Sequence, residues 1–357
     1  MRKISTQNLK AGMKLAKAIY SSRGGLIMPA GIELSSEYVD KLNTAGVGEV
    51  YIDDPRVADL EIIEPISEVT KLKAIRCLKE SYVLLQKGTG PKVDFESLRQ
   101  VVKEILEDVN RNNPKVVNLI TIKSDEDYLF VHAINVTILA VVMARLAGYQ
   151  QHLMDIALGA YLKDLGMARL DQQVINAPRT FTGDETAMIR RHPEISLEII
   201  QDMTGLSAFT KAIIIQHHER CDGTGYPTGL KESHIHDYAK IVAIADTFAA
   251  LISDRPHRAR IKPHEAIEFM MSAAGFEFDH NFTDCFCKCT VPYPVGTMVQ
   301  LNSGEKGVVV DLGKGLASRP VVRVFYDSGG QEVKPCYNLN LSDGQYQTKI
   351  ITEALEE

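Results

Sequence analysis

The spacing of apolar residues predicts that the chain contains a long helical part between two smaller parts with strands. Residues 1–62 hold short apolar runs (AKAIY, GLIM, GEVYI) separated by Gly and Pro, with one serine-capped helix expected from Ser36 to about Ala45. Residues 115–290 repeat apolar positions at helical spacing almost throughout. Residues 291–357 return to β-branched runs broken by glycine turns, which predicts a β-rich extension of three to five strands. The predicted fold class is mainly α, with a small α+β domain at 1–62.

Two further segments have local signals of helix structure. Residues 63–114 are charged and carry apolar positions at helical spacing; we interpret them as a solvated helical connector, with a dimerising helix pair as the alternative. Thr182 and Glu185 form a capping-box pattern, which predicts a helix that runs toward His192. Pro193 follows and predicts a kink or a new helix start.

The composition of the chain argues against several classes of protein. The chain has 357 residues, 45% of them hydrophobic, and a net charge of −6, which argues against a general basic surface for nucleic acid polymers. The charged N-terminal stretch does not resemble a signal peptide, and no uninterrupted apolar run reaches the ~18 residues of a membrane span. The six cysteines are too few for a disulfide framework in a chain of this size, so we expect a cytoplasmic protein. The CFCKC run at 285–289 lacks zinc-site spacing, and we expect structural thiols there.

Ionisable residues lie inside apolar stretches of the helical part, where burial without a partner is costly. A divalent cation accepts neutral imidazoles and carboxylates together, so it would offset the desolvation of a whole group. Two such ions form a common hydrolytic arrangement for phosphodiesters, in which one activates water and both stabilise the reacting oxygens. The candidate metal ligands are His132, Asp164, His192, His217, His218 and Asp246.

A glycine-rich turn follows two of these histidines, in the stretch QHHERCDGTGYP at 216–227. Glycines let backbone N–H groups approach an anion, and Tyr226 offers a ring that can stack on a base. Downstream, Arg255 and Arg258 lie three residues apart, a spacing that suits a phosphate. An ordinary loop ending in proline is the alternative interpretation of the turn.

The order of these residues resembles the HD-GYP family of bacterial cyclic-di-GMP phosphodiesterases. The likeness covers about 115–290, and HHExxDGxGYP is its most specific string. It implies an all-helical HD-type domain, with iron or manganese as the divalent ion, and opening of cyclic-di-GMP to pGpG. Under this resemblance the six candidate ligands hold metal, and Asp164 bridges. The resemblance also implies that Gly225 and Tyr226 line the nucleotide pocket and that Arg255 and Arg258 lie near its phosphates.

The stretch that usually reads HDIGK in this family is here Lys163-Asp164-Leu165-Gly166-Met167. Met167 removes a cation near the phosphate, and Tyr128 replaces a third-metal glutamate, so we expect one or two ions. An ammonium has no lone pair for a metal. Either Lys163 fills the place of the first ion as a fixed positive charge, or it points to solvent. Asp164 and Lys163 are the candidate catalytic residues.

Three functions remain open from the sequence. The first is metal-dependent hydrolysis of cyclic-di-GMP, which the Lys163 and Met167 replacements would slow. The second is a catalytically inactive module that binds cyclic-di-GMP or a signalling protein. The third is hydrolysis of another nucleotide, which the HHExxDGxGYP string makes the weakest. A homodimer is compatible with each of them.

Overall fold

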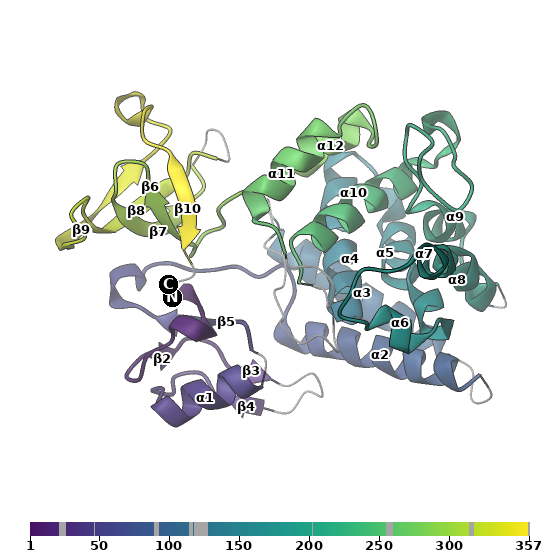
Figure 1. Cartoon of the computed structure of the whole chain (residues 1–357), viewed down its shortest axis with the longest axis horizontal. Helices are drawn as coiled ribbons and strands as arrows, with labels where there is room; N and C mark the ends of the chain where they lie inside the picture. The colour runs from purple at the N-terminus through teal and green to yellow at the C-terminus, as the bar shows by residue number, and fades with distance from the viewer. Residues whose placement is uncertain are drawn as a thin grey trace. The chain divides into compact units, whose positions relative to one another are not determined.

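The computed structural model describes residues 1–20, 26–45, 47–88, 93–113, 117, 128–201, 203–254, 260–313 and 318–355 (Figure 1). The chain forms two compact units. The first combines the N-terminal residues 1–63 with the C-terminal residues 291–357, and the second contains the helical part. The mainly α fold class, with small sheets near both ends of the chain, is confirmed. The expected domain boundaries at 62, 114 and 290 stay predictions.

The N-terminal part of the first unit is a small α+β assembly. Strands β1 (Arg2–Ser5), β5 (Glu49–Asp53) and β2 (Lys14–Leu15) form an antiparallel sheet in that order, and β3 (Ile19–Tyr20) pairs with β4 (Leu26–Met28). Helix α1 (Ser36–Thr44) begins after Ser35, whose hydroxyl accepts the Tyr38 N–H, which confirms the predicted serine cap. Alternate residues of β5, Val50 and Ile52, are buried, as expected for a strand with one face on a core.

The C-terminal part is a five-stranded antiparallel sheet in the order β10-β6-β7-β8-β9, which confirms the predicted β extension. Its strands are β6 (Met298–Leu301), β7 (Lys306–Asp311), β8 (Val321–Tyr326), β9 (Glu332–Asn340) and β10 (Ile351–Leu355). Val57 packs in one buried cluster with Met298, Val308 and Phe325, so the two ends of the chain share a core. The guanidinium of Arg56 lies 3.9 Å from the Phe325 ring centre.

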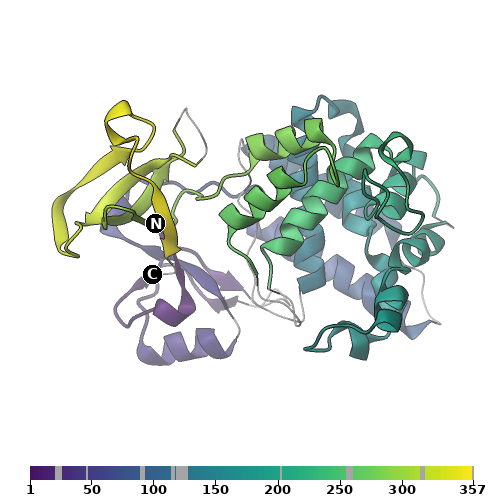
Figure 2. The ribbon, with the colours of Figure 1, turned by 45° about the horizontal axis from the view of Figure 1, so that its top comes forward.

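The second unit is built around α4 (Tyr128–Leu146), an almost entirely apolar helix (Figure 2). Buried on nearly all sides, α4 contacts α5 and α10, and the views agree that these helices lie side by side. The remaining helices are α2 (Glu68–Lys87), α3 (Phe95–Asn112), α5 (Leu153–Leu162), α6 (Gln172–Ile175), α7 (Gly183–Ile189), α8 (His192–Ile200), α9 (Ala208–Gln216), α10 (Asp237–Leu251), α11 (Pro263–Ser272) and α12 (His280–Cys289). A short 3₁₀ helix, η5 (Leu165–Arg169), follows α5.

Helices α2 and α3 are not a solvated connector, so that part of the prediction is wrong. They pack on the second unit and bury apolar positions such as Leu78 and Ile105. Two phenols tie α2 to the helices that carry the site: Tyr161 donates to the Ala74 carbonyl at 2.7 Å, and Tyr82 donates to the Asp164 carbonyl at 2.6 Å. The apolar spacing in α2 therefore marks a core-facing surface.

Other local predictions are confirmed. Thr182 and Glu185 form the capping box at the start of α7. Pro193 lies in the first turn of α8, which is a new helix start and not a kink. In addition, all six cysteines are free thiols.

One helix in the described part of the chain, α4, is long and apolar enough to cross a membrane by length and composition. The expectation from the sequence concerned an uninterrupted apolar run, and the absence of a membrane span stays a prediction. His132 and Asn135 interrupt the apolar residues of this helix. Of its most apolar 18-residue window, 83% is buried inside the structure, as in the central helix of a folded core.

Candidate functional site

The six predicted metal ligands come from five places in the second unit and converge on one site. His132 lies on α4, Asp164 at the junction of α5 and η5, and His192 at the start of α8. His217 caps the C-terminus of α9 and His218 follows it, while Asp246 lies within α10. Their ligand atoms form two overlapping groups, in each of which all atoms lie within 4.8 Å of one another. Asp164 belongs to both groups.

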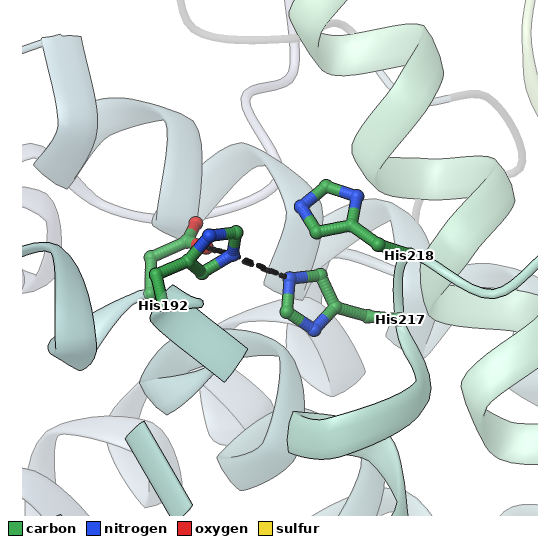
Figure 3. Close-up of side chains that lie close together, drawn as sticks. His192, His217 and His218 are labelled. Carbon is green, nitrogen blue, oxygen red and sulfur yellow. Dashed lines mark hydrogen bonds and ion pairs between the residues drawn. The ribbon is translucent and has the colours of Figure 1, made fainter. Parts of the chain in front are cut away.

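We call Asp164, His192, His217 and His218 the three-histidine half (Figure 3). The Nδ1 atoms of His192 and His217 each lie 2.8 Å from a backbone carbonyl, of Ile189 and Ile214 respectively. A carbonyl oxygen can only accept, so each Nδ1 carries a proton, and in a neutral imidazole the Nε2 then carries a lone pair. The two Nε2 atoms nevertheless face each other at 3.3 Å.

A carboxylate oxygen completes this group of acceptors. Oδ1 of Asp164 lies 3.3 Å from Nε2 of His192 and 3.6 Å from Nε2 of His217. Burial lowers the pKa of His217 and holds that of His218 well below its usual value, so these two imidazoles are neutral at pH 7. Neutral imidazoles and a carboxylate that converge on one point are the donor set of a divalent cation, so these residues fit one.

We call Lys163, His132 and Asp246, together with the shared Asp164, the lysine half. Lys163 is only 1% exposed. Its ammonium lies 2.7 Å from Oδ1 of Asp246 and also contacts Oδ2 of Asp164. Nε2 of His132 lies 2.8 Å from the same Asp246 oxygen. Of the two interpretations from the sequence, the one in which Lys163 points to solvent is therefore wrong.

The positive charge in the lysine half is supplied by a side chain, Lys163. Burial alone would lower the pKa of Lys163, but the carboxylates of Asp164 and Asp246 outweigh it and raise that pKa. Burial opposes ionisation of both carboxylates, yet the lysine holds their pKa values well below the usual range. A cation at this place would have to displace an ammonium that already contacts both carboxylates. The lysine half does not fit a metal ion.

Close backbone packing holds the two halves together. The Ser196 hydroxyl on α8 donates to the Lys163 carbonyl at 2.7 Å and accepts the Gly166 N–H at 2.8 Å. A Cβ on Gly166 would lie 2.2 Å from the His192 carbonyl oxygen, so a side chain there would push α8 away. Ser196 and Tyr82 are supporting residues that the sequence analysis missed, because nothing in their local pattern shows which backbone they contact.

The turn after His218 is braced from inside. Glu219 is 2% exposed, and its carboxylate accepts the N–H groups of Thr228 at 2.8 Å and Leu230 at 2.9 Å. Asp222 accepts the Thr224 N–H at 2.9 Å. A Cβ on Gly225 would lie 2.5 Å from the His218 carbonyl oxygen, which explains the glycine. Glu219 and Asp222 therefore brace the backbone of the turn.

Tyr226 is brought against the three-histidine half by this turn. Its ring stacks on His218, with centroids 4.5 Å apart, and lies edge-on to His192 at 6.3 Å. His218 thus covers one face of the phenol, and the guanidinium of Arg190 lies over the same ring, 5.3 Å from its centre. Burial raises the pKa of Tyr226, so the phenol stays neutral. Arg255 and Arg258, the predicted phosphate contacts, lie outside the described residues.

Comparison with known families agrees with this geometry. A family model described as an HD domain matches residues 102–282. The chain belongs to the HD domain family. A second model, a KOW domain associated with HD domain, matches residues 298–357 and so covers the five-stranded sheet.

Curated relatives of this HD domain protein carry names that agree with the predicted family. Cyclic di-GMP phosphodiesterase PA4108 of Pseudomonas aeruginosa is 27% identical over 98% of this chain and 91% of its own. Cyclic di-GMP phosphodiesterase response regulator RpfG of Xanthomonas campestris is 34% identical, over 37% of this chain and 35% of its own. The predicted membership in the HD-GYP family is confirmed.

Among solved structures, Bd1817, a HDG"Y"P protein from Bdellovibrio bacteriovorus, is 16% identical to this HD domain protein. The match covers 80% of this chain and 97% of that one, with a TM-score of 0.48.

Proposed function

We propose that this protein binds cyclic-di-GMP at the site and hydrolyses it to pGpG with the help of one divalent ion, iron or manganese. The observation that carries the proposal is the meeting of unprotonated Nε2 atoms and a carboxylate oxygen within 3.6 Å in the three-histidine half. The names of two relatives supply the substrate. We propose Asp164, His192, His217 and His218 as the residues that hold the ion, and His132 and Asp246 as partners of Lys163.

When bound, the ion would supply Lewis-acid chemistry, which activates water and polarises a phosphoryl oxygen. The chain's own residues prepare the site for it. The carbonyls of Ile189 and Ile214 fix the tautomers of His192 and His217, so that both present lone pairs. Lys163 adds a fixed positive charge beside Asp164, where it would favour negative charge that develops on a nearby phosphodiester.

On the nucleotide side, we propose that Tyr226 stacks on a guanine with the face that His218 leaves uncovered. Gly225 lets the turn lie close to His218, which keeps Tyr226 over the three-histidine half. Arg255 and Arg258 stay predicted phosphate contacts. A cytoplasmic location, a homodimer and further signalling partners also stay proposals.

A second candidate function is binding of cyclic-di-GMP without turnover. The lysine half favours it, because the Lys163 ammonium already contacts both carboxylates and so leaves one metal position where a two-ion clamp needs two. Met167 at the end of the same stretch adds no charge for the phosphate. Both candidates use the same pocket and differ only in chemistry.

The test is an oxygen-free hydrolysis assay with Fe(II) or Mn(II), in which chromatography follows the products. The wild type is run beside a Lys163→His, Met167→Lys double variant and a His217→Gln variant that lacks a proposed metal ligand. Production of pGpG by the wild type, lost in His217→Gln, supports the enzyme. Production by the double variant alone supports the binding module. Displacement of bound cyclic-di-GMP by another nucleotide at lower concentration would support the third hypothesis and contradict both.

A further inference from the structure

Arg190 is a cation at the rim of the site that the sequence analysis did not single out. It caps the C-terminus of α7, two residues before His192. The carbon at the centre of its guanidinium lies 5.3 Å from the Tyr226 ring centre. Tyr226 in turn stacks on His218, so the charge of Arg190 is joined to the three-histidine half through one aromatic ring.

This guanidinium is not used by an ion pair within the described residues, unlike its neighbours. Arg179 makes two hydrogen bonds to the Glu185 carboxylate, at 2.8 and 2.7 Å. Nε of Arg191 lies 4.0 Å from Oε2 of Glu194. Arg220, behind the turn, donates to the Thr247 hydroxyl at 3.1 Å and to the Glu219 carbonyl at 3.0 Å. The N–H groups of the Arg190 guanidinium can therefore donate to a partner outside the chain.

Charge at the site favours an anionic partner. Lys163, Asp164 and Asp246 sum to one negative charge, and one divalent ion would turn this into one positive charge. A cyclic dinucleotide carries a negative charge on each of its phosphodiesters, so within the described part of the site one phosphate still lacks a matching cation. An exposed arginine beside the base-stacking ring is placed to supply it, and its planar fork suits two phosphate oxygens.

We infer that Arg190 binds a phosphate of the substrate and positions the dinucleotide against Tyr226. This inference rests on the proposed function, because it assigns the substrate's second phosphate to a residue of the same site. Arg190 is a positioning residue, since the geometry places it beside Tyr226 and not beside the metal ligands. The ring of Tyr226 orients the guanidinium before the ligand arrives, which limits the side-chain entropy lost on binding.

The experiment measures the affinity of the Mn(II)-loaded full chain for cyclic-di-GMP and for GMP by calorimetry. Variants are Arg190→Gln, Arg190→Lys and the matched control Arg191→Gln, which removes an adjacent exposed arginine. We expect Arg190→Gln to weaken cyclic-di-GMP binding about tenfold, as for one lost charged hydrogen bond. Arg190→Lys should recover part of that loss, and Arg191→Gln should change affinity by less than about twofold.

Two further readouts separate a phosphate contact from a structural role. Rising salt should weaken wild-type binding more than binding by Arg190→Gln, and manganese content should stay the same in all variants. Equal affinities of Arg190→Gln and Arg191→Gln would overturn the inference while leaving the proposed function in place. Arg190-dependent binding of GMP without any binding of cyclic-di-GMP would overturn the proposed substrate but support the phosphate contact. Absence of binding by the wild type to both ligands would overturn both.

Discussion

The two halves of the site hold similar acceptors but obtain positive charge differently. In the lysine half, the chain supplies its own cation, and Lys163 contacts both carboxylates. In the three-histidine half, the Nε2 atoms of His192 and His217 face each other at 3.3 Å, while each Nδ1 proton is directed at a backbone carbonyl. Asp164 belongs to both halves, with one oxygen toward each.

This difference shows that the chain itself can supply the positive charge that two buried carboxylates need. Replacing a histidine by lysine at position 163 keeps a positive charge where the carboxylates need one. A neutral residue there would leave two buried carboxylates facing each other. The lysine therefore preserves the fold of the site while it removes a position for metal.

The largest expected effect is on stability, from Lys163→Met. Loss of the ammonium leaves Asp164 and Asp246 without their cation and should cost about 3–5 kcal/mol of unfolding free energy in metal-free protein. The measurement is urea unfolding with and without Mn(II), which should restore part of the loss. Lys73→Met is the control: its exposed ammonium lies 2.9 Å from Oε2 of Glu104, and its loss should cost under about 1 kcal/mol. Equal costs for the two variants would contradict a special role for Lys163.

Metal removal should have the next largest effect, and only through the three-histidine half. With free Mn(II) at about 100 times its dissociation constant, the wild type should gain about 2.7 kcal/mol of stability over chelated protein. His217→Gln should lose most of this gain, because it removes a lone pair from the centre of the group. His234→Gln, an exposed histidine, should keep it. Equal gains in wild type and His217→Gln would place the ion elsewhere.

Glu219→Gln should show whether the stability of the turn is independent of metal binding in the site. The change removes the charge from two buried N–H···O bonds and should cost about 1–2 kcal/mol. The Mn(II)-dependent gain should persist, because Glu219 contacts the turn and not the metal ligands. Asp222→Asn, at an exposed position, should cost less. Loss of the metal response in Glu219→Gln would show that the turn and the three-histidine half act as one unit.

The smallest effect concerns Asp54, a carboxylate in the first unit that arginines neutralise as Lys163 does in the site. Burial would raise its pKa, but hydrogen bonds from Arg56 and Arg2 lower it to about 2. Its contribution to stability is therefore present above the unfolded value near 4 and is lost as pH falls toward 2. Asp54→Asn should reduce the fall of the thermal midpoint between about pH 4 and pH 2. The lost contribution to the free energy of unfolding should be under about 1 kcal/mol, since Arg56 is partly exposed. An unchanged pH profile would contradict this assignment.

The parts of the fold that local signals encode were predictable. Ser35 and the Thr182–Glu185 capping box act within one helical turn, so sequence alone located the starts of α1 and α7. The packing of α2 was missed, because it depends on Tyr161 and on the backbone of Asp164, which lie far along the chain. Charged residues on its outer face suggested solvent, while its inner apolar positions were the better signal.

For the site, residue types were predictable but charge balance was not. Histidines and aspartates in apolar helices indicated a shared cation, and all six converge. Whether Lys163 joined them depended on Asp246, which reaches the lysine only through the packing of α10 on α4. Arg190 gave no signal, because an arginine at a helix end is ordinary until its distance to Tyr226 is known.

The most direct test of the account is the number of manganese ions bound per chain, measured by elemental analysis after loading and removal of excess metal. Wild type and Lys163→His are compared, because histidine restores a lone pair where the ammonium lies. We expect one ion in the wild type and two in the variant. Two ions in the wild type would contradict the claim that Lys163 takes the place of a metal.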